Sequence, residues 1–212
     1  ARFNRRNQRP AVFFDRDGVL NPEVEGMIRR HEQFTLLPGA RDAVRRVNAS
    51  DYLAVVVTNQ PIIAKGFATL DDLAGIHAAM ETLLGQHDDD AQASGGGAYM
   101  DRIYFCPHHP ERGFEGERIE YKIDCECRKP GTGMIERAGR ELGIDLTRSF
   151  IIGDRTTDIE CGRRAGLTTV MVRTGAAGSD GKVDVTPDHV CDDVSQAVDW
   201  ILSHNLAETT SR

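Results

Sequence analysis

Short apolar runs alternate with amphipathic stretches along most of this chain. Runs of strand length occur at 11–15 (AVFFD), 53–58 (LAVVVT), 101–106 (DRIYFC), 149–153 (SFIIG) and 168–173 (TTVMVR). Helical patterns lie between and after these runs, at 38–50, 69–86, 133–142, 158–165 and 193–204. Strands that alternate with helices are typical of βαβ units. The pattern therefore predicts an α/β fold with a doubly wound, mostly parallel sheet.

Local signals support several of these elements. Within 38–50, apolar residues recur at the i, i+3, i+4 and i+7 positions of one helix face, and Pro38 stands near the helix start. Thr69 and Asp72 have the spacing of a capping box at the start of the next helix. The run 53–58 is apolar at nearly every position, which is typical of a strand covered on both faces.

The length of 212 residues suits one domain with one sizeable core. We expect a flexible basic tail at 1–10, a single domain over 11–205 and a second flexible tail at 206–212. The polar, glycine-rich segment 87–98 (HDDDAQASGGGA) is predicted to be a loop insertion with a solvated charge run. No stretch is long enough for a separate cap domain.

Hydropathy and charge limit the classes of partner. No apolar run reaches 18 residues, so we expect no membrane partner. The four arginines in the first nine residues precede no apolar segment that would make a secretory signal. The net charge of −7 argues against a nucleic-acid partner, which needs a concentrated basic surface. A small anionic ligand fits better, because a local pocket can be positive on an acidic protein. We favour a monomer.

Polar side chains stand where three of the predicted strands end. Asp15 and Asp17 follow the first strand, Thr58 and Asn59 end the second, and Asp154 follows the fourth. The carboxyl ends of parallel strands share one edge of the sheet, where ligands bind. We therefore expect these residues to converge on one crevice.

The residue types at that crevice point to phosphoryl transfer. Asp15 and Asp17 are close enough to repel each other unless a cation lies between them or one is protonated. A divalent cation lets one carboxylate attack phosphorus, while the other carboxyl protonates the leaving oxygen. Asp154 adds an oxygen ligand that suits Mg²⁺. Thr58 and Lys129 are predicted to bind the non-bridging phosphate oxygens.

A second cluster has the composition of a zinc site. The chain has five cysteines, and three of them lie close to a histidine in the sequence. Cys106, His108, Cys125 and Cys127 would form the set of four nitrogen and sulfur ligands that tetrahedral Zn²⁺ prefers. His109 is an alternative to His108, although the i, i+2 spacing favours the latter. Four protein ligands leave no open position, so a structural role is expected. Clustered thiols indicate a reducing compartment, and we expect a cytoplasmic protein. Cys161 and Cys191 are interpreted as apolar core residues.

Four segments, FFDRDGVLN, VVTNQ, RKP and GDRTTD, resemble in order the motifs of the haloacid dehalogenase (HAD) superfamily of phosphatases. Together with the C-x-H and C-x-C pairs, they are similar to one branch of that superfamily. The branch holds the D-glycero-D-manno-heptose 1,7-bisphosphate 7-phosphatases and the histidinol-phosphatases. The resemblance runs from about residue 11 to 172.

This resemblance implies a HAD-like fold and roles for individual residues. Asp15 matches the nucleophile and Asp17 the general acid. Mg²⁺ would be held by Asp15, by the backbone carbonyl of Asp17 and by Asp154. Thr58 and Lys129 match the phosphate-binding pair. The positions that contact substrate in the branch correspond here to Glu23, Val24, Glu25, Gly26, Asn59, Gln60, Pro61, Arg128 and Arg155.

Some features of the motifs stay open at this stage. Asp158 matches the second acid of the GDxxxD motif, but it is equally interpretable as a first-turn helix acid. Pro61 and Met27 depart from the residues expected in the branch, and both touch loops that face the substrate.

The resemblance implies a small phosphorylated sugar as substrate, and specifically the C7 phosphate of a heptose 1,7-bisphosphate. The 16 residues between His108 and Cys125 favour this substrate over histidinol phosphate. A non-catalytic phospholigand-binding protein is the alternative from another class, and the paired acids argue against it. Arg128, Arg155 and, more weakly, Lys65 are candidates to bind a second anionic group.

Overall fold

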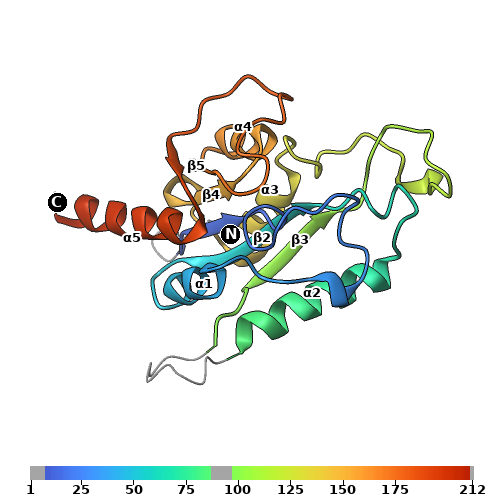
Figure 1. The fold of residues 1–212 in the computed structure, drawn as a ribbon. Coiled ribbons are helices and arrows are strands. Elements are labelled where there is room, and N and C mark those ends of the chain that lie inside the picture. The colour runs from blue at the N-terminus through green and yellow to red at the C-terminus, as the bar shows by residue number, and fades with distance from the viewer. Residues whose placement is uncertain (1–7, 87–96, 211–212) are drawn as a thin grey trace.

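A computed structural model describes residues 8–86 and 97–210. Its sheet has six strands in the order β3-β2-β1-β4-β5-β6, and every neighbouring pair is parallel (Figure 1). The strands are β1 (Ala11–Phe14), β2 (Leu53–Asn59), β3 (Arg102–Cys106), β4 (Phe150–Gly153), β5 (Thr168–Val172) and β6 (His189–Cys191). The predicted doubly wound α/β sheet is confirmed.

Helices cover both faces of this sheet (Figure 1). One face carries α1 (Ala40–Asn48), α2 (Leu70–Gly85) and α5 (Val194–Thr210), and the other carries α3 (Gly133–Leu142) and α4 (Thr156–Ala165). Within the described residues, short 3-10 helices lie at His31–Gln33, Ile119–Tyr121 and Leu146–Arg148. Alternate residues of β1 enter two separate cores: Val12 and Phe14 face the α1 side, while Phe13 faces the α3 side. Burial on both faces explains why the strands are apolar throughout.

The predicted elements recur with small shifts. Asp72 N donates to Thr69 Oγ1 at 3.0 Å and Thr69 N donates to Asp72 Oδ2 at 2.8 Å, which is the capping box expected at the start of α2. The sequence pattern missed β6, whose three residues include an exposed Val190. Helix α5 runs to Thr210, into the segment 206–212 where a tail was expected.

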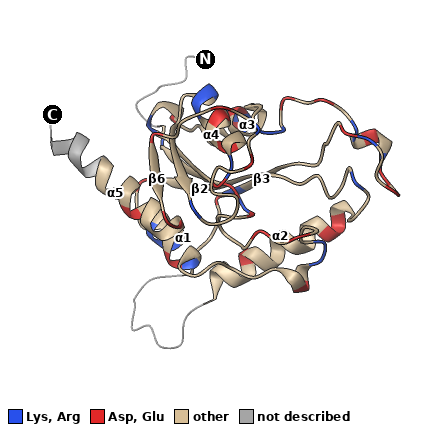
Figure 2. Ribbon diagram, turned by 45° about the horizontal axis from the view of Figure 1, so that its top comes forward, with Lys and Arg blue, Asp and Glu red and all other residues tan. Residues whose placement is uncertain are grey.

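Some expectations fall outside the described residues, namely most of the 1–10 tail and of the 87–98 insertion. Within the described part, no helix has the length and apolarity needed to span a membrane. Figure 2 shows acidic and basic residues interspersed over the helices and loops of this part rather than gathered on one side.

Candidate active site

Strand order brings the predicted acids together at one edge of the sheet. β1 lies between β2 and β4, so Asp15, Thr58 and Asp154 stand at the ends of three adjacent strands. Asp15 N donates to Ile152 O at 2.9 Å, which extends the pairing of β1 with β4 as far as the site. The residues that the sequence predicted to converge therefore lie together at this edge of the sheet.

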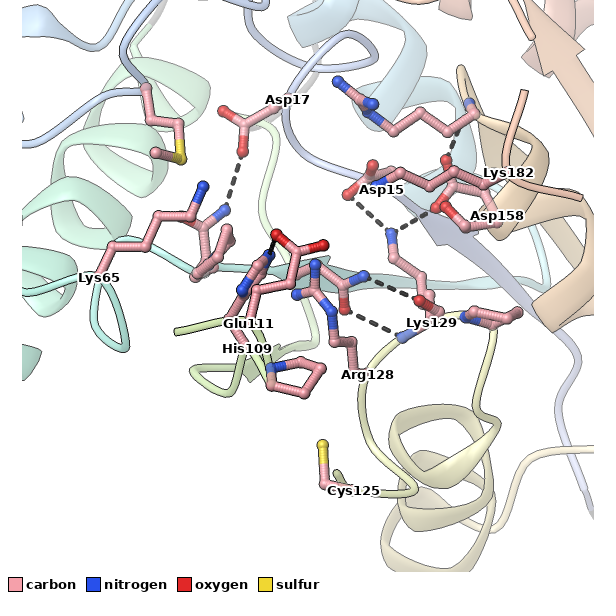
Figure 3. Close-up of a pocket in the computed structure, with 18 of the residues that line it drawn as sticks. Asp15, Asp17, Lys65, His109, Glu111, Cys125, Arg128, Lys129, Asp158 and Lys182 are labelled. Carbon is pink, nitrogen blue, oxygen red and sulfur yellow. Dashed lines mark hydrogen bonds and ion pairs between the residues drawn. The ribbon is translucent and has the colours of Figure 1, made fainter. Parts of the chain in front are cut away.

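Lys129 lies at the centre of the site and is almost fully buried. Its ammonium contacts Asp15 Oδ1 at 2.9 Å and Asp158 Oδ1 at 2.7 Å, and it donates to Val57 O at 2.8 Å (Figure 3). Asn59 fixes the backbone of Lys129, accepting from its N–H at 3.0 Å and donating to its carbonyl at 3.2 Å. Burial acts to lower the pKa of Lys129, but the two carboxylates outweigh it and raise that pKa. The lysine is therefore a fixed cation.

Three carboxylates gather beside this lysine. Oxygen atoms of Asp15, Asp154 and Asp158 all lie within 4.8 Å of one another, and all three residues are buried. Burial and the neighbouring acids raise the pKa of Asp15 to about 6, against the opposing effect of Lys129, and raise that of Asp154 to about 8. One ammonium does not balance three such groups. The cluster has the charge and the oxygen donors of a divalent-cation site.

Asp154 is the clearest candidate cation ligand. Its Oδ2 accepts from Ala176 N at 2.7 Å, whereas its buried Oδ1 has no hydrogen-bond partner. Glycines enclose the carboxylate: a Cβ at Gly18 or at Gly175 would lie 2.4 or 2.3 Å from Oδ2. A buried oxygen without a partner is costly unless something binds it. The residues present therefore fit a Mg²⁺ ion.

Asp17 is held differently from the three clustered acids. Its carboxylate accepts from Arg16 Nη2 at 2.9 Å, from Asn21 Nδ2 at 2.9 Å and from Gln60 Nε2 at 2.8 Å. Burial acts to raise the pKa of Asp17, but Arg16 and these hydrogen bonds outweigh it and hold that pKa below its ordinary value. Gln60 Nε2 also donates to Thr58 Oγ1 at 2.9 Å, so one amide joins the predicted acid to the predicted phosphate-binding hydroxyl.

Asp158 satisfies both interpretations left open by the sequence. Its Oδ2 accepts from Arg155 N at 3.1 Å, which caps the start of α4. Its Oδ1 meets Lys129 and lies with the other two acids. It is thus a helix acid that also orients the central lysine.

A pocket of about 670 Å³ opens over these residues. Most of the predicted substrate positions line it, and these are Glu23, Val24, Asn59, Gln60, Pro61, Arg128 and Arg155. Glu25 and Gly26 do not line it. Arg155 forms an ion pair with Glu23, so these two predicted contacts also bind each other. The sequence analysis missed Lys182 and Val183, which line the pocket from the loop between β5 and β6.

The four predicted zinc ligands form one cluster at the base of the loop 106–127. Five separations within it run from 3.1 Å (Cys127 Sγ to Cys106 Sγ) to 3.7 Å (Cys106 Sγ to His108 Nδ1). A tetrahedron with Zn–S bonds of about 2.3 Å has edges of about 3.8 Å. Hydrogen bonding to Cys106 lowers the pKa of Cys127 to about 5, whereas the same hydrogen bond raises the pKa of Cys106 and burial raises that of Cys125, so Cys127 is the thiolate among the three. His109 lies outside it and lines the pocket instead.

Comparisons with known proteins agree with this geometry. A model of the HAD-hydrolase-like family matches residues 126–197. A D-glycero-D-manno-heptose-1,7-bisphosphate 7-phosphatase of Thermosynechococcus vestitus is 38% identical, over 92% of this chain and 97% of its own. A D-glycero-beta-D-manno-heptose-1,7-bisphosphate 7-phosphatase of Haemophilus influenzae is 37% identical, over 87% and 92%. The chain belongs to this family of HAD phosphatases.

A solved structure extends the agreement within the family to three dimensions. The crystal structure of the D,D-heptose 1,7-bisphosphate phosphatase from B. bronchiseptica, complexed with magnesium and phosphate, has a TM-score of 0.76 and 28% identity. The match covers 92% of this chain and 99% of that one. As a HAD phosphatase, the protein is a hydrolase of phosphate esters.

Proposed function

We propose that this protein is a Mg²⁺-dependent phosphatase that removes the C7 phosphate of D-glycero-D-manno-heptose 1,7-bisphosphate. The observation that carries the proposal is the buried set of Asp15, Asp154 and Asp158, of which Asp15 and Asp158 contact Lys129 and line a pocket large enough for a sugar phosphate. The relatives named for this activity match nearly the whole chain, which supports the choice of substrate.

Mg²⁺ would be held by the carboxylates of Asp15 and Asp154, with the Asp17 carbonyl as a further ligand. The partnerless Oδ1 of Asp154 supports this assignment. When bound, the ion supplies positive charge that screens the nucleophile from the anionic phosphate. Side chains of the protein carry out the nucleophilic attack, the phosphate binding and the proton transfers.

Asp15 is the nucleophile in this proposal. Arg16 N at 2.7 Å and Lys129 both contact its Oδ1, which leaves Oδ2 to attack phosphorus. A bond forms between Oδ2 and phosphorus, and the bond between phosphorus and the sugar oxygen breaks. Thr58 and Lys129 bind non-bridging oxygens, where charge is stabilised during the transfer. The product of this step is an aspartyl-phosphate.

Asp17 would donate the proton that the leaving sugar oxygen requires. It would then take a proton from the water that attacks the aspartyl-phosphate at phosphorus, which frees phosphate and restores Asp15. In the substrate-free protein the Arg16 guanidinium favours the ionised carboxylate. The negative charge of a bound phosphate acts in the opposite direction, so substrate binding favours the protonated acid.

The Cys/His cluster is proposed to hold a structural Zn²⁺. The near-tetrahedral separations among Cys106, His108, Cys125 and Cys127 support this, and so does the position of Arg128 directly after the last ligand. Thiols of this kind persist in a reducing compartment, so we propose that the protein acts in the cytoplasm. We also propose that it acts as a monomer.

A substrate panel tests the proposed function. We expect the highest kcat/KM for the heptose 1,7-bisphosphate when it is measured against the 7-monophosphate, histidinol phosphate and p-nitrophenyl phosphate. Asp15→Asn should lower turnover of every substrate by at least about a thousandfold, because an amide does not attack phosphorus. Circular dichroism should find the variant folded. A preference for histidinol phosphate, or activity of Asp15→Asn within tenfold of wild type, contradicts the proposal.

A further inference from the structure

Lysine is rare in this chain, and every lysine lies at or beside the active-site pocket. The 26 basic residues are 22 arginines and only 4 lysines. Lys65, Lys129 and Lys182 line the pocket, and Lys122 lies over the ring of Phe114 at 4.6 Å. A lysine ammonium is a compact charge on a flexible stem, which suits an anion that shifts during a reaction. Lys129 serves the reacting phosphate, so Lys65 and Lys182 still need a role.

The cations of the pocket divide into paired and unpaired groups. Lys129 is paired with two acids, and Arg155 is paired with Glu23. Within the described residues, Lys65, Arg128 and Lys182 form no ion pair. Glu111 also lines the pocket and acts on Lys65 through its charge, but it lies within ion-pair distance of neither Lys65, Arg128 nor Lys182. Three cations without an ion-pair partner around one pocket favour an anionic ligand beyond the reacting phosphate.

The β5–β6 loop (residues 173–188) holds Lys182 between two anchors. On one side, the carboxylate of Asp180 accepts from Thr156 N at 2.8 Å and from Thr156 Oγ1 at 3.0 Å, at the first residue of α4. On the other side, Val183 N donates to the same Thr156 Oγ1 at 3.2 Å. Lys182 therefore projects from a fixed backbone, although its own side chain is exposed.

Lys65 is held by the loop 106–127. Its ammonium lies over the ring of Phe114, 4.5 Å from the centroid. The backbones of the two loops touch, because Arg118 N donates to Ala64 O at 3.0 Å. Burial lowers the pKa of Lys65, and the charges of Arg128, Lys122 and Lys182 add to that shift. These cations are thus close enough to repel one another, which an anion between them would relieve.

Figure 3 shows Lys65 and Lys182 entering the pocket from opposite sides, with Arg128 between them. We propose that Lys182 is a specificity-determining residue which, together with Lys65, binds the anionic group of the substrate that is remote from the reacting phosphate. Phe114 acts as a positioning residue for Lys65. The proposal rests on the proposed function and adds a contact from the β5–β6 loop to the Arg128 contact implied by the family.

Substrate pairs test this role directly. Lys182→Ala should lower kcat/KM for the bisphosphate by at least about tenfold, the value of one charge-assisted contact, and that for the 7-monophosphate by less than about threefold. Lys65→Ala should behave in the same way. Phe114→Leu should reduce the bisphosphate preference about threefold without changing metal content, because it removes the cation–π contacts of Lys65 and Lys122 but keeps an apolar side chain at this position. Arg173→Ala, which removes a cation of the same loop that is paired with Asp192, is the matched control and should leave both substrates unchanged.

Two results would overturn the proposal. Equal losses for both substrates in Lys182→Ala would mean that this lysine serves the reacting phosphate, and no loss for either would mean that it does not contact substrate. Failure of the proposed function has a different signature, because wild-type protein would then show no preference for the bisphosphate at all.

Discussion

Asp154→Asn should make the Mg²⁺-free protein more stable at pH 8 while it removes activity. The Asp154 carboxyl is buried next to Asp15 and Asp158, and its pKa is raised from 3.8 to about 8. Between these pH values the folded protein holds a proton that the unfolded chain has released. The free energy of unfolding therefore falls as pH rises from about 4 to 8, and it levels off above the folded-state pKa.

The shift sets the size of the effect. A rise from 3.8 to about 8 is about four pKa units, and at about 1.4 kcal/mol per unit the upper limit is about 6 kcal/mol. Water entry and side-chain relaxation remove part of this penalty, so we expect Asp154→Asn to gain about 2–3 kcal/mol at pH 8. For a chain of this length, that raises Tm by about 5–10 °C. The asparagine carbonyl can still accept from Ala176 N.

The assay is thermal unfolding between pH 5 and 8, in buffer freed of Mg²⁺ without a chelator, so that the cysteine cluster keeps its metal. The gain of Asp154→Asn over wild type should grow with pH and be small at pH 5. Added Mg²⁺ should stabilise wild type and leave Asp154→Asn unchanged. If the variant is less stable than wild type at pH 8 without Mg²⁺, or gains as much from Mg²⁺, the electrostatic reasoning is refuted.

Two further variants test the surroundings of the site. Cys125→Ala should reduce bound zinc, measured by elemental analysis, from about one per chain to less than half. Because Arg128 directly follows the cluster, the same variant should raise KM about tenfold in steady-state kinetics. The control variant Cys161→Ala changes a cysteine outside the cluster and should keep its zinc. Gln60→Ala removes the amide that joins Asp17 to Thr58 and should lower kcat about tenfold. A change confined to KM would mean that Gln60 only binds substrate.

Much of the fold could be predicted because its strands are buried on both faces. Runs such as 53–57 have no polar positions, and the polar or acidic residues after them are unusual enough to mark the ends of strands. Sheet order then brought Asp15 and Asp154 together without further information. β6 escaped prediction because only three residues pair, and one of them is exposed.

The orientation of side chains within the site could not be predicted from the sequence. Asp17 was expected to face the substrate, but its contacts depend on Arg16, whose side chain is 1% exposed and reaches both Asp17 and Gln60. Lys182 was missed for a related reason. The β5–β6 loop has no hydrophobic period, and the contacts of Asp180 and Val183 with Thr156 bring it back to the start of α4.

The loop 106–127 borders the pocket, and physical chemistry explains why it needs two anchors. A segment of this length with little regular structure loses much conformational entropy when it is ordered. The thiol and imidazole cluster fixes its base. At its far end, Lys122 donates to Glu111 O at 2.6 Å and contacts Glu117 at 3.1 Å, beneath Phe114. Losing either anchor should therefore disturb different substrate contacts, Arg128 at the base and Lys65 at the far end.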